Sequence, residues 1–237
     1  MSLDWEISAK AWIAHLGDGG DWGRVAVLDA PMLARVRRGG FSNALDVGCG
    51  EGRFCRMLQA EGIETVGIDP VDALLDQARR YDAAGDYRPE RAEALPFDDA
   101  AFDLVVSYLT LIDILDAEAA ITEMVRVLRP GGTLLIANLT SMFSSVLPTE
   151  WSQDDTGRLQ VSVDDYLATR DAWVDWLDNT IRQVHRPLSS YIQSLLGAGQ
   201  SLTHFEEPMP RDGDQEQLEQ YRRVPWFLIM EWQKPLS

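Results

Sequence analysis

Apolar residues first recur at helical spacing along this chain and then gather into short runs separated by amphipathic stretches. Residues 5–16 and 25–38 carry apolar side chains three or four positions apart, which predicts two helices before any strand. Short apolar runs follow. We expect strands at residues 43–47, 65–68, 87–92, 102–107 and 133–139, with helices between them at 53–61, 71–80 and 117–128.

This alternation of strands and helices predicts right-handed strand–helix–strand units and a parallel sheet covered on both faces. It stops after residue 139 and resumes with a helix at 188–196 and strands at 202–206 and 226–232. The fold class that we expect is therefore α/β, with a Rossmann-like, doubly wound, mostly parallel sheet of seven strands. Residues 141–187, with a helix expected at 163–183, are predicted to form a helical insertion after the fifth strand.

Charge and composition narrow the function classes. A formal net charge of −17 argues against a nucleic-acid partner, which needs a basic surface. No apolar run has the length of a membrane span, and the start of the chain lacks the apolar core of a signal peptide, so we expect a cytoplasmic protein. The two cysteines, Cys49 and Cys55, have no metal-site spacing. We expect reduced thiols and no bound metal.

The segment ALDVGCGEGRF, at residues 44–54, carries the clearest chemical signal. Its glycines follow the first strand as G-x-G-x-G, and Arg53 stands where a dinucleotide-binding pattern would place its third glycine. No lysine follows, so the phosphate loop of nucleotide hydrolases does not fit either. Asp46 and Glu51 lie before and among the glycines. These acids suit a cation better than a pyrophosphate.

A further acid follows the second strand. Asp69 lies where a carboxylate can accept hydrogen bonds from both hydroxyls of a ribose. The ligand implied by the glycines and the acids is a nucleoside that lacks phosphate and carries positive charge. S-adenosylmethionine, with a ribose, a sulfonium and an amino-acid tail, meets these conditions.

Four segments in order resemble class I S-adenosylmethionine-dependent methyltransferases, in the methyltransferase type 11 group typified by ubiquinone-biosynthesis enzymes. They are ALDVGCGEGRF, VGIDP (66–70), RAEALPFDDAAFDLVVSYLTL (91–111) and VLRPGGTLLIA (127–137). The resemblance implies a single methyltransferase domain over residues 1–237. Its parts would be a helical N-terminal cap (1–40), a cofactor-binding core (41–140), a substrate-side insertion (141–187) and a C-terminal segment completing the sheet (188–237).

The resemblance also implies site residues and S-adenosylmethionine as cofactor, with S-adenosylhomocysteine as product. Asp69 would bind the ribose, and Tyr108 and Leu109 would face the methyl donor. The implied cofactor-binding positions are Asp46, Gly48, Cys49, Gly50, Asp69, Pro70, Ala92, Glu93, Ala94, Tyr108 and Leu109. Two departures stand out. The family often has Asp where this chain has Arg91, and many relatives have His-His where it has Ile112-Asp113.

The acceptor side rests on weaker signals. Asp113, after the fourth strand, and His185, before a helix, are the candidate catalytic residues. Each has a plain alternative, as a turn residue and as a buried helix-entry residue. Trp12, Tyr166 and Trp173 are candidate substrate contacts, and Trp173 and Trp176 would share a helical face.

Three functions remain open at this point. The first is methyl transfer to the oxygen, nitrogen or carbon of a small molecule, by a monomer or a homodimer that binds no nucleic acid. The second is non-catalytic binding of S-adenosylmethionine or S-adenosylhomocysteine. The third is a nicotinamide-dependent oxidoreductase, which Arg53 in the third glycine position argues against.

Overall fold

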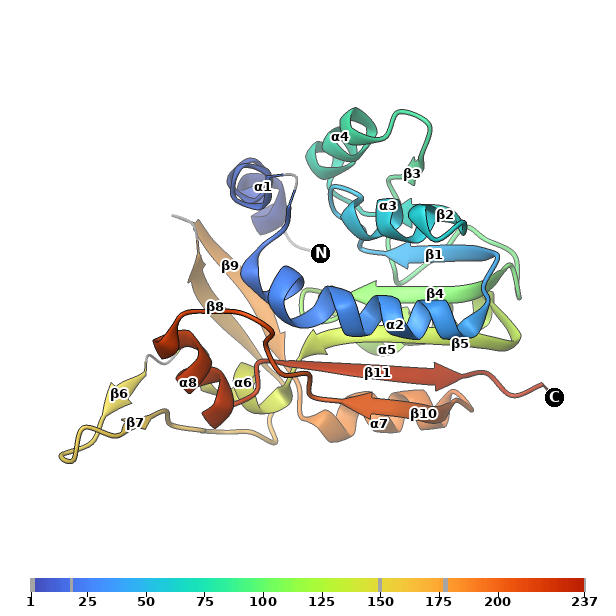
Figure 1. Cartoon of the computed structure of the whole chain (residues 1–237). Helices are drawn as coiled ribbons and strands as arrows, with labels where there is room; N and C mark the ends of the chain where they lie inside the picture. Colours follow the sequence, from blue (N-terminus) through green and yellow to red (C-terminus); the bar gives the residue numbers. More distant parts are fainter. Residues whose placement is uncertain (1–2, 18, 149–150, 177–178, 237) are drawn as a thin grey trace.

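A seven-stranded sheet runs through the middle of the computed structural model, which describes residues 3–17, 19–148, 151–176 and 179–236 (Figure 1). The strands lie in the order β10, β11, β5, β4, β1, β2, β3. Their bounds are Asn43–Val47 (β1), Glu64–Ile68 (β2), Asp86–Arg88 (β3), Phe102–Tyr108 (β4), Leu128–Leu139 (β5), Ser201–Glu206 (β10) and Phe227–Gln233 (β11). This confirms the expected sheet.

The directions of the strands place the glycine loop. β11 pairs antiparallel with both β5 and β10, while the pairs that join β5, β4, β1, β2 and β3 are all parallel. The strand order reverses between β1 and β4, which are neighbours. Ligands of open α/β sheets bind beyond the carboxyl ends of the strands at such a reversal. The loop that follows β1 lies there.

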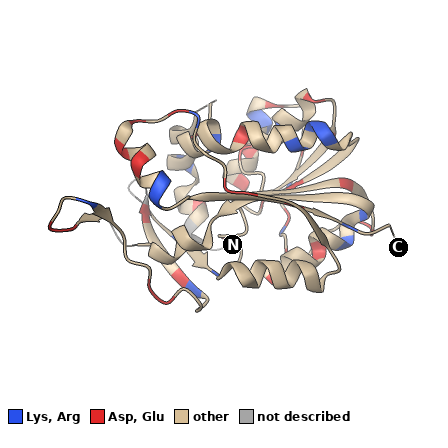
Figure 2. Ribbon diagram, turned by 60° about the horizontal axis from the view of Figure 1, so that its bottom comes forward, with Lys and Arg blue, Asp and Glu red and all other residues tan. Residues whose placement is uncertain are grey.

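Two layers of helices cover the sheet, which Figure 2 shows nearly edge-on. Along β5, Leu134 and Ile136 pack with α5 and α7, while Leu135 and Ala137 pack with α2 and α3 on the other face. This alternation buries both faces, as a parallel sheet requires. The helices of these layers are α2 (Asp29–Gly39), α3 (Arg53–Ala60), α5 (Ala117–Val127) and α7 (Leu188–Gly197).

The N-terminal segment is helical, as predicted. α1 spans Leu3–Leu16 and packs against α4 (Asp72–Tyr81). The second predicted helix begins earlier than expected, because a π-helical segment, η1 (Gly23–Leu28), leads directly into α2. Segments of π-helix occur frequently at functional sites. In the described ranges no helix combines the length and apolar character needed to cross a bilayer.

The insertion after β5 is not the predicted helical one. A short helix, α6 (Ser141–Val146), precedes two antiparallel hairpins, β6–β7 (Ser152–Gln153 and Leu159–Gln160) and β8–β9 (Arg170–Trp176 and Asn179–His185). The helix expected at 163–183 was therefore wrong where the chain is described; residues 177–178 lie outside the described ranges. In β8, Ala172 is buried and Trp173 is half exposed, which is the two-residue period of a strand.

Two further elements differ from the prediction. β3 ends at Arg88 rather than at residue 92, because Pro89 follows and has no N–H to donate to a neighbouring strand. A helix that was not expected, α8 (Gln215–Arg223), begins after Asp214. The Asp214 side chain accepts a hydrogen bond from Gln217 N at 2.8 Å and so caps the helix.

Candidate active site

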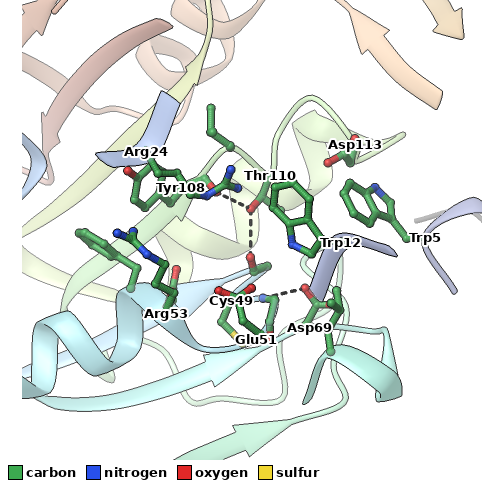
Figure 3. Close-up of a pocket in the computed structure, with 16 residues that line it drawn as sticks. Trp5, Trp12, Arg24, Cys49, Glu51, Arg53, Asp69, Tyr108, Thr110 and Asp113 are labelled. Atoms are coloured by element: carbon green, nitrogen blue, oxygen red, sulfur yellow. Dashed lines mark hydrogen bonds between the residues drawn. The ribbon is translucent and has the colours of Figure 1, made fainter. Parts of the chain in front are cut away.

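The glycine loop forms one wall of a cavity at the carboxyl ends of β1, β2 and β4, with about 660 Å³ of empty space that is partly open to solvent (Figure 3). We name it the loop cavity. α1 and η1 from the N-terminal segment form the opposite wall. The lining residues are Trp5, Trp12, Arg24, Asp46, Gly48, Cys49, Gly50, Glu51, Arg53, Phe54, Asp69, Leu74, Tyr108, Leu109, Thr110 and Asp113.

Two glycines of the loop are needed for different reasons. Gly48 has φ +76°, and a Cβ there would lie 2.1 Å from the Thr110 Cγ2 atom, so the Thr110 side chain fills this space. Gly50 has φ +55°, but a Cβ there would meet no atom within 4 Å. Both backbone conformations favour glycine. Of these two glycines, only Gly50 has open space where a Cβ would lie.

Asp69, directly after β2, is tied to the glycine loop. Its Oδ2 accepts a hydrogen bond from Gly50 N at 3.1 Å, and its Oδ1 accepts one from Val71 N at 2.9 Å. Burial raises the pKa of Asp69 to about 6, although these two backbone hydrogen bonds lower it. Each carboxylate oxygen can accept a second hydrogen bond, so the group can still bind two hydroxyls of a ligand.

Asp46, near the end of β1, is buried deeper. The Cys55 thiol donates to its Oδ2 at 3.3 Å, while no described group bonds its Oδ1. Burial raises the pKa of Asp46 to about 7, and the carboxylates of Glu51 and Asp69 raise it further. A buried carboxylate without a partner is costly. A cationic ligand in the loop cavity would stabilise it.

The acids of the loop cavity outnumber its available cations. Asp46, Glu51, Asp69 and Asp113 line the cavity, and none of these four forms a salt bridge with a described residue. The two lining arginines have partners. Arg24 pairs with Asp21 and Arg53 pairs with Asp29. The free charge of the cavity is therefore negative.

Asp29 connects three parts of the chain around this cavity. It accepts two hydrogen bonds from the Arg53 guanidinium, at 2.8 and 2.5 Å, and one from the Tyr108 hydroxyl at 2.8 Å. Arg53 Nε also donates to the Gly19 carbonyl at 3.1 Å. Arg53 departs from the dinucleotide pattern. Through Asp29 and Gly19 it links the N-terminal segment to the glycine loop, and Asp29 also contacts Tyr108 at the end of β4.

A narrow cavity continues from the loop cavity past Gly48 and Thr110. We name it the side cavity; it has about 250 Å³ of empty space. Arg91 and Glu93 form a salt bridge at 2.9 Å at its rim. The predicted residues Pro70, Ala92 and Glu93 line it, whereas Ala94 lines neither this cavity nor the loop cavity. Its residues are Gly48, Ile68, Pro70, Glu90, Arg91, Ala92, Glu93, Thr110 and Ile114.

A third cavity adjoins the loop cavity on the other side, with about 1300 Å³ of empty space open to solvent. We name it the aromatic cavity. It shares Trp5, Trp12, Arg24, Leu109 and Asp113 with the loop cavity. The remaining lining comes from α1, η1 and the residues before it, the turn after β4, the end of β5, α6 and the residue after it, the β8–β9 hairpin, α8, and β11 with the residue before it: His15, Asp21, Trp22, Gly23, Ile112, Leu139, Phe143, Leu147, Val174, Ile181, Gln183, Gln217, Trp226 and Phe227.

Asp113 lies where the loop cavity and the aromatic cavity meet. It follows β4 in a turn in which its backbone N donates to the Thr110 carbonyl at 2.9 Å. Its side chain is buried, and its Oδ1 has no hydrogen-bond partner among the described residues. Burial raises the pKa of Asp113 to about 7; the nearby Trp5 indole lowers it, and the Asp69 carboxylate raises it. Figure 3 shows the Trp5 ring beside it.

His185, the other candidate catalytic residue, lies outside the lining of these three cavities. It is fully buried. Its Nδ1 is 2.7 Å from Ser144 Oγ, and its Nε2 is 2.8 Å from the Tyr166 carbonyl oxygen. Burial lowers the pKa of His185. Both ring nitrogens are thus in use at the base of the insertion, which favours the structural alternative.

Of the three candidate substrate contacts, one lines a cavity and two do not. Trp12 lines both the loop cavity and the aromatic cavity. Tyr166 and Trp173 line none of the three cavities, and Trp173 is 51% exposed. Because β8 alternates its faces, the neighbour Val174 lines the aromatic cavity instead. The expectation of a helical face shared by Trp173 and Trp176 no longer applies.

Sequence reasoning missed several lining residues. Arg24 comes from η1 and Trp22 precedes it, Phe143 comes from α6, and Trp226 precedes β11. No local pattern marks them as site residues, because they reach the cavity only through the packing of distant segments. Thr110 carries one signal that could have been read, since it follows β4 at the same sheet edge as the glycine loop.

The sheet order, the glycine loop and the acid after β2 are those of class I S-adenosylmethionine-dependent methyltransferases. Residues 45–136 match a family model described as a methyltransferase domain. A solved S-adenosylmethionine-dependent methyltransferase from Mesorhizobium loti superposes with a TM-score of 0.79 at 25% identity, over 92% of this chain and 100% of that one.

Curated relatives match over a shorter range. A malonyl-[acyl-carrier protein] O-methyltransferase of Serratia marcescens is 38% identical over 114 residues, which are 48% of this chain and 45% of the relative. A ubiquinone/menaquinone biosynthesis C-methyltransferase of Idiomarina loihiensis is 38% identical over 122 residues, 47% of each chain. The chain thus spans about half the length of the curated relatives it matches.

Proposed function

We propose that this chain transfers a methyl group from S-adenosylmethionine to a small-molecule acceptor. The observation that carries the proposal is the meeting of two unlike cavities at Leu109 and Asp113. The loop cavity is acidic and bounded by glycines, while the aromatic cavity is large and mainly apolar. Such a pair fits a cationic methyl donor on one side and an acceptor on the other.

The residues present fit the methyl donor. Asp69 would accept the ribose hydroxyls, and the side cavity near Pro70, Ala92 and Glu93 would hold the adenine. The methionine end would lie along Gly48, Cys49 and Gly50, where the open space beside Gly50 admits it. Asp46, with its unpartnered oxygen, would face the positive end of the ligand. Tyr108 and Leu109 would lie closest to the methyl group.

When bound, S-adenosylmethionine supplies a methyl group on a positively charged sulfur. The chain's own residues would align the acceptor with that methyl group and exclude water. A base is needed only where the attacking atom carries a proton. Asp113 lies at the junction of the cavities and would accept that proton. The contacts of His185 support a structural role for it, in the base of the insertion.

Domain roles follow the same division. The helical cap at 1–40 would close the loop cavity through Trp5, Trp12 and Arg24, and the insertion at 141–187 would shape the acceptor side through Phe143 and Val174. The acceptors named for the relatives are not assigned to this chain, because the family match ends at residue 136, before the insertion. We also propose a cytoplasmic location, no nucleic-acid partner, and a monomer or homodimer.

Calorimetric titration tests this proposal. We expect S-adenosylmethionine and S-adenosylhomocysteine to bind the wild-type chain, and NADH not to bind. Asp69→Asn should weaken both adenosyl ligands by about tenfold, because it removes the charge that binds the ribose. The exposed Asp76→Asn on α4 serves as the matched control and should bind as the wild type does. Binding of NADH in place of the adenosyl ligands would contradict the proposal.

A further inference from the structure

The aromatic cavity contains one buried carboxylate with an oxygen that lacks a hydrogen-bond partner among the described residues. Asp113 is 9% exposed, its Oδ1 has no hydrogen-bond partner among the described residues, and it lines this cavity. A carboxylate in such surroundings is stable in its charged form only beside a cation or donor. The Trp5 indole beside Asp113 is a neutral donor that lowers its pKa, so the ligand that occupies the cavity is the natural source of a cation.

The arginine of the cavity acts on Asp113 only through its charge, which lowers the pKa of that carboxyl without forming a salt bridge to it. Arg24 lines the cavity but is held by Asp21, with its guanidinium 4.8 Å above the Trp12 ring. His15 also stacks on the Trp12 ring, with the two ring centroids 6.4 Å apart. Among the described residues, no salt bridge joins Asp113 to Arg24, which pairs with Asp21 instead. An acidic ligand would meet Asp113 and Asp21 and find no unpaired arginine.

Aromatic rings form much of the remaining wall. Trp22 and Trp226 meet edge to face with centroids 5.4 Å apart, and Phe143 stacks on Trp226 at 5.2 Å. Trp5 meets Trp12 edge to face at 5.8 Å, close to Asp113. Such rings bind apolar and aromatic groups, and their faces attract cations. The wall thus combines aromatic surface with one negative charge.

We propose that the acceptor is an arylalkylamine, in which the aromatic ring lies among Trp22, Phe143 and Trp226 and the protonated amino nitrogen is held by Asp113, which takes the proton that this nitrogen must lose before it attacks the methyl group. This inference rests on the proposed function, since it names the substrate class for the same site. The position of Asp113 at the junction places the bound nitrogen at the opening to the loop cavity. Carboxylate acceptors are excluded by the same charge.

Three indoles of similar shape test the amine preference without a known substrate. Tryptamine carries a cation, 3-ethylindole is its neutral counterpart, and indole-3-acetate carries an anion. Each is titrated by calorimetry into wild-type chain at about pH 8, where an alkylamine is protonated and Asp113, with its pKa at about 7, is mostly ionised. Titrations are done both with and without S-adenosylhomocysteine.

We expect tryptamine to bind about tenfold more tightly than 3-ethylindole, and indole-3-acetate to bind most weakly. In Asp113→Asn the preference for tryptamine over 3-ethylindole should fall to within about threefold, while 3-ethylindole binds as before. Asp98→Asn, an exposed carboxylate outside the cavities, is the matched control for the change in net charge and should keep the full preference.

Equal or tighter binding of indole-3-acetate would overturn the inference, as would a preference that survives in Asp113→Asn. Failure of every indole to bind a chain that binds S-adenosylhomocysteine would overturn it as well. Failure of S-adenosylhomocysteine itself would instead contradict the proposed function. The titrations of the indoles alone would still report on the amine preference in that case.

Discussion

Arg53 and Asp29 form a two-point salt bridge across the glycine loop, with nitrogen–oxygen distances of 2.8 and 2.5 Å. Their side chains are 14% and 13% exposed, so the pair is largely shielded from water. It joins the first turn of α3 to the first turn of α2. Arg53 therefore has a structural role at the position where a dinucleotide-binding pattern would have glycine.

Arg53→Ala is expected to lower the free energy of unfolding by about 2 kcal/mol, because it leaves the buried Asp29 carboxylate without its charged partner. Affinity for S-adenosylhomocysteine should fall too, since the N-terminal segment is no longer held over the cavity. Urea unfolding and calorimetry measure the two effects. The matched control is Arg37→Ala. Arg37 also makes a two-point pair, with Glu61, but its side chain is 59% exposed, so the loss of stability should be much smaller than for Arg53→Ala.

How far the sequence could predict this site depends on the kind of contact. The carboxyl ends of adjacent parallel strands meet at one edge of the sheet. Asp46 and Gly48 lie at the end of β1 and Asp69 lies directly after β2, so their convergence was predictable. Arg24 and Trp226 are about two hundred residues apart and meet at the aromatic cavity only through tertiary packing. No local pattern in the sequence contains that information.

The insertion shows a second limit of prediction from the sequence. The segment RDAWVDW at residues 170–176 has tryptophans three apart, which fits a helix, and alternating exposure, which fits a strand. Pairing with β9 decides between them, through contacts such as Val174 opposite Ile181. That pairing is between separate segments and cannot be read from either one. The same misreading moved Trp173 into the predicted substrate contacts.

Gly50→Ala separates ligand binding from backbone strain. Gly50 and Gly62 both have positive φ, +55° and +82°, and a Cβ at either would meet no atom within 4 Å. Each alanine variant should therefore lose about 1 kcal/mol of stability from strain alone. Only Gly50→Ala places a methyl group where the methyl donor would lie, so only this variant should bind S-adenosylhomocysteine more weakly, by tenfold or more as an order-of-magnitude estimate. Equal affinities in the two variants would argue against the proposed ligand position.

The free energy of unfolding should fall as pH rises from about 5 to about 8 in the absence of ligand. Burial raises the pKa of Asp46 and Asp113 to about 7 and that of Asp69 to about 6, whereas unfolded carboxyls titrate near pH 4. Across this window these three carboxyls hold more protons in the folded chain than in the unfolded chain; His185, with its lowered pKa, acts in the opposite direction but is one group against three. Deprotonation therefore favours unfolding.

Asp113→Asn should reduce that fall and raise the stability at about pH 8, because one of the buried charges is removed. Urea unfolding at several pH values measures both slopes. Carboxyls held by arginines, such as Asp21 and Glu231, have lowered pKa values and finish titrating below this window. A slope as steep in the variant as in the wild type would show that Asp113 does not titrate there.

His185→Ala is expected to lower the free energy of unfolding by about 2 kcal/mol, because Ser144 Oγ and the Tyr166 carbonyl lose their buried partner. Affinity for S-adenosylhomocysteine should stay at the wild-type value, since His185 lines none of the three cavities. Ser144→Ala removes one of the two contacts and should cost less. A loss of ligand affinity with unchanged stability would instead indicate that His185 contributes to the active site.

The crystal structure of the complex with S-adenosylhomocysteine tests the central claim most directly. The account predicts the ribose hydroxyls on Asp69, the adenine in the side cavity beside Pro70 and Ala92, and the sulfur directed toward Asp113 and the aromatic cavity. A ligand bound elsewhere, or one whose sulfur points away from that cavity, would contradict methyl transfer at this site.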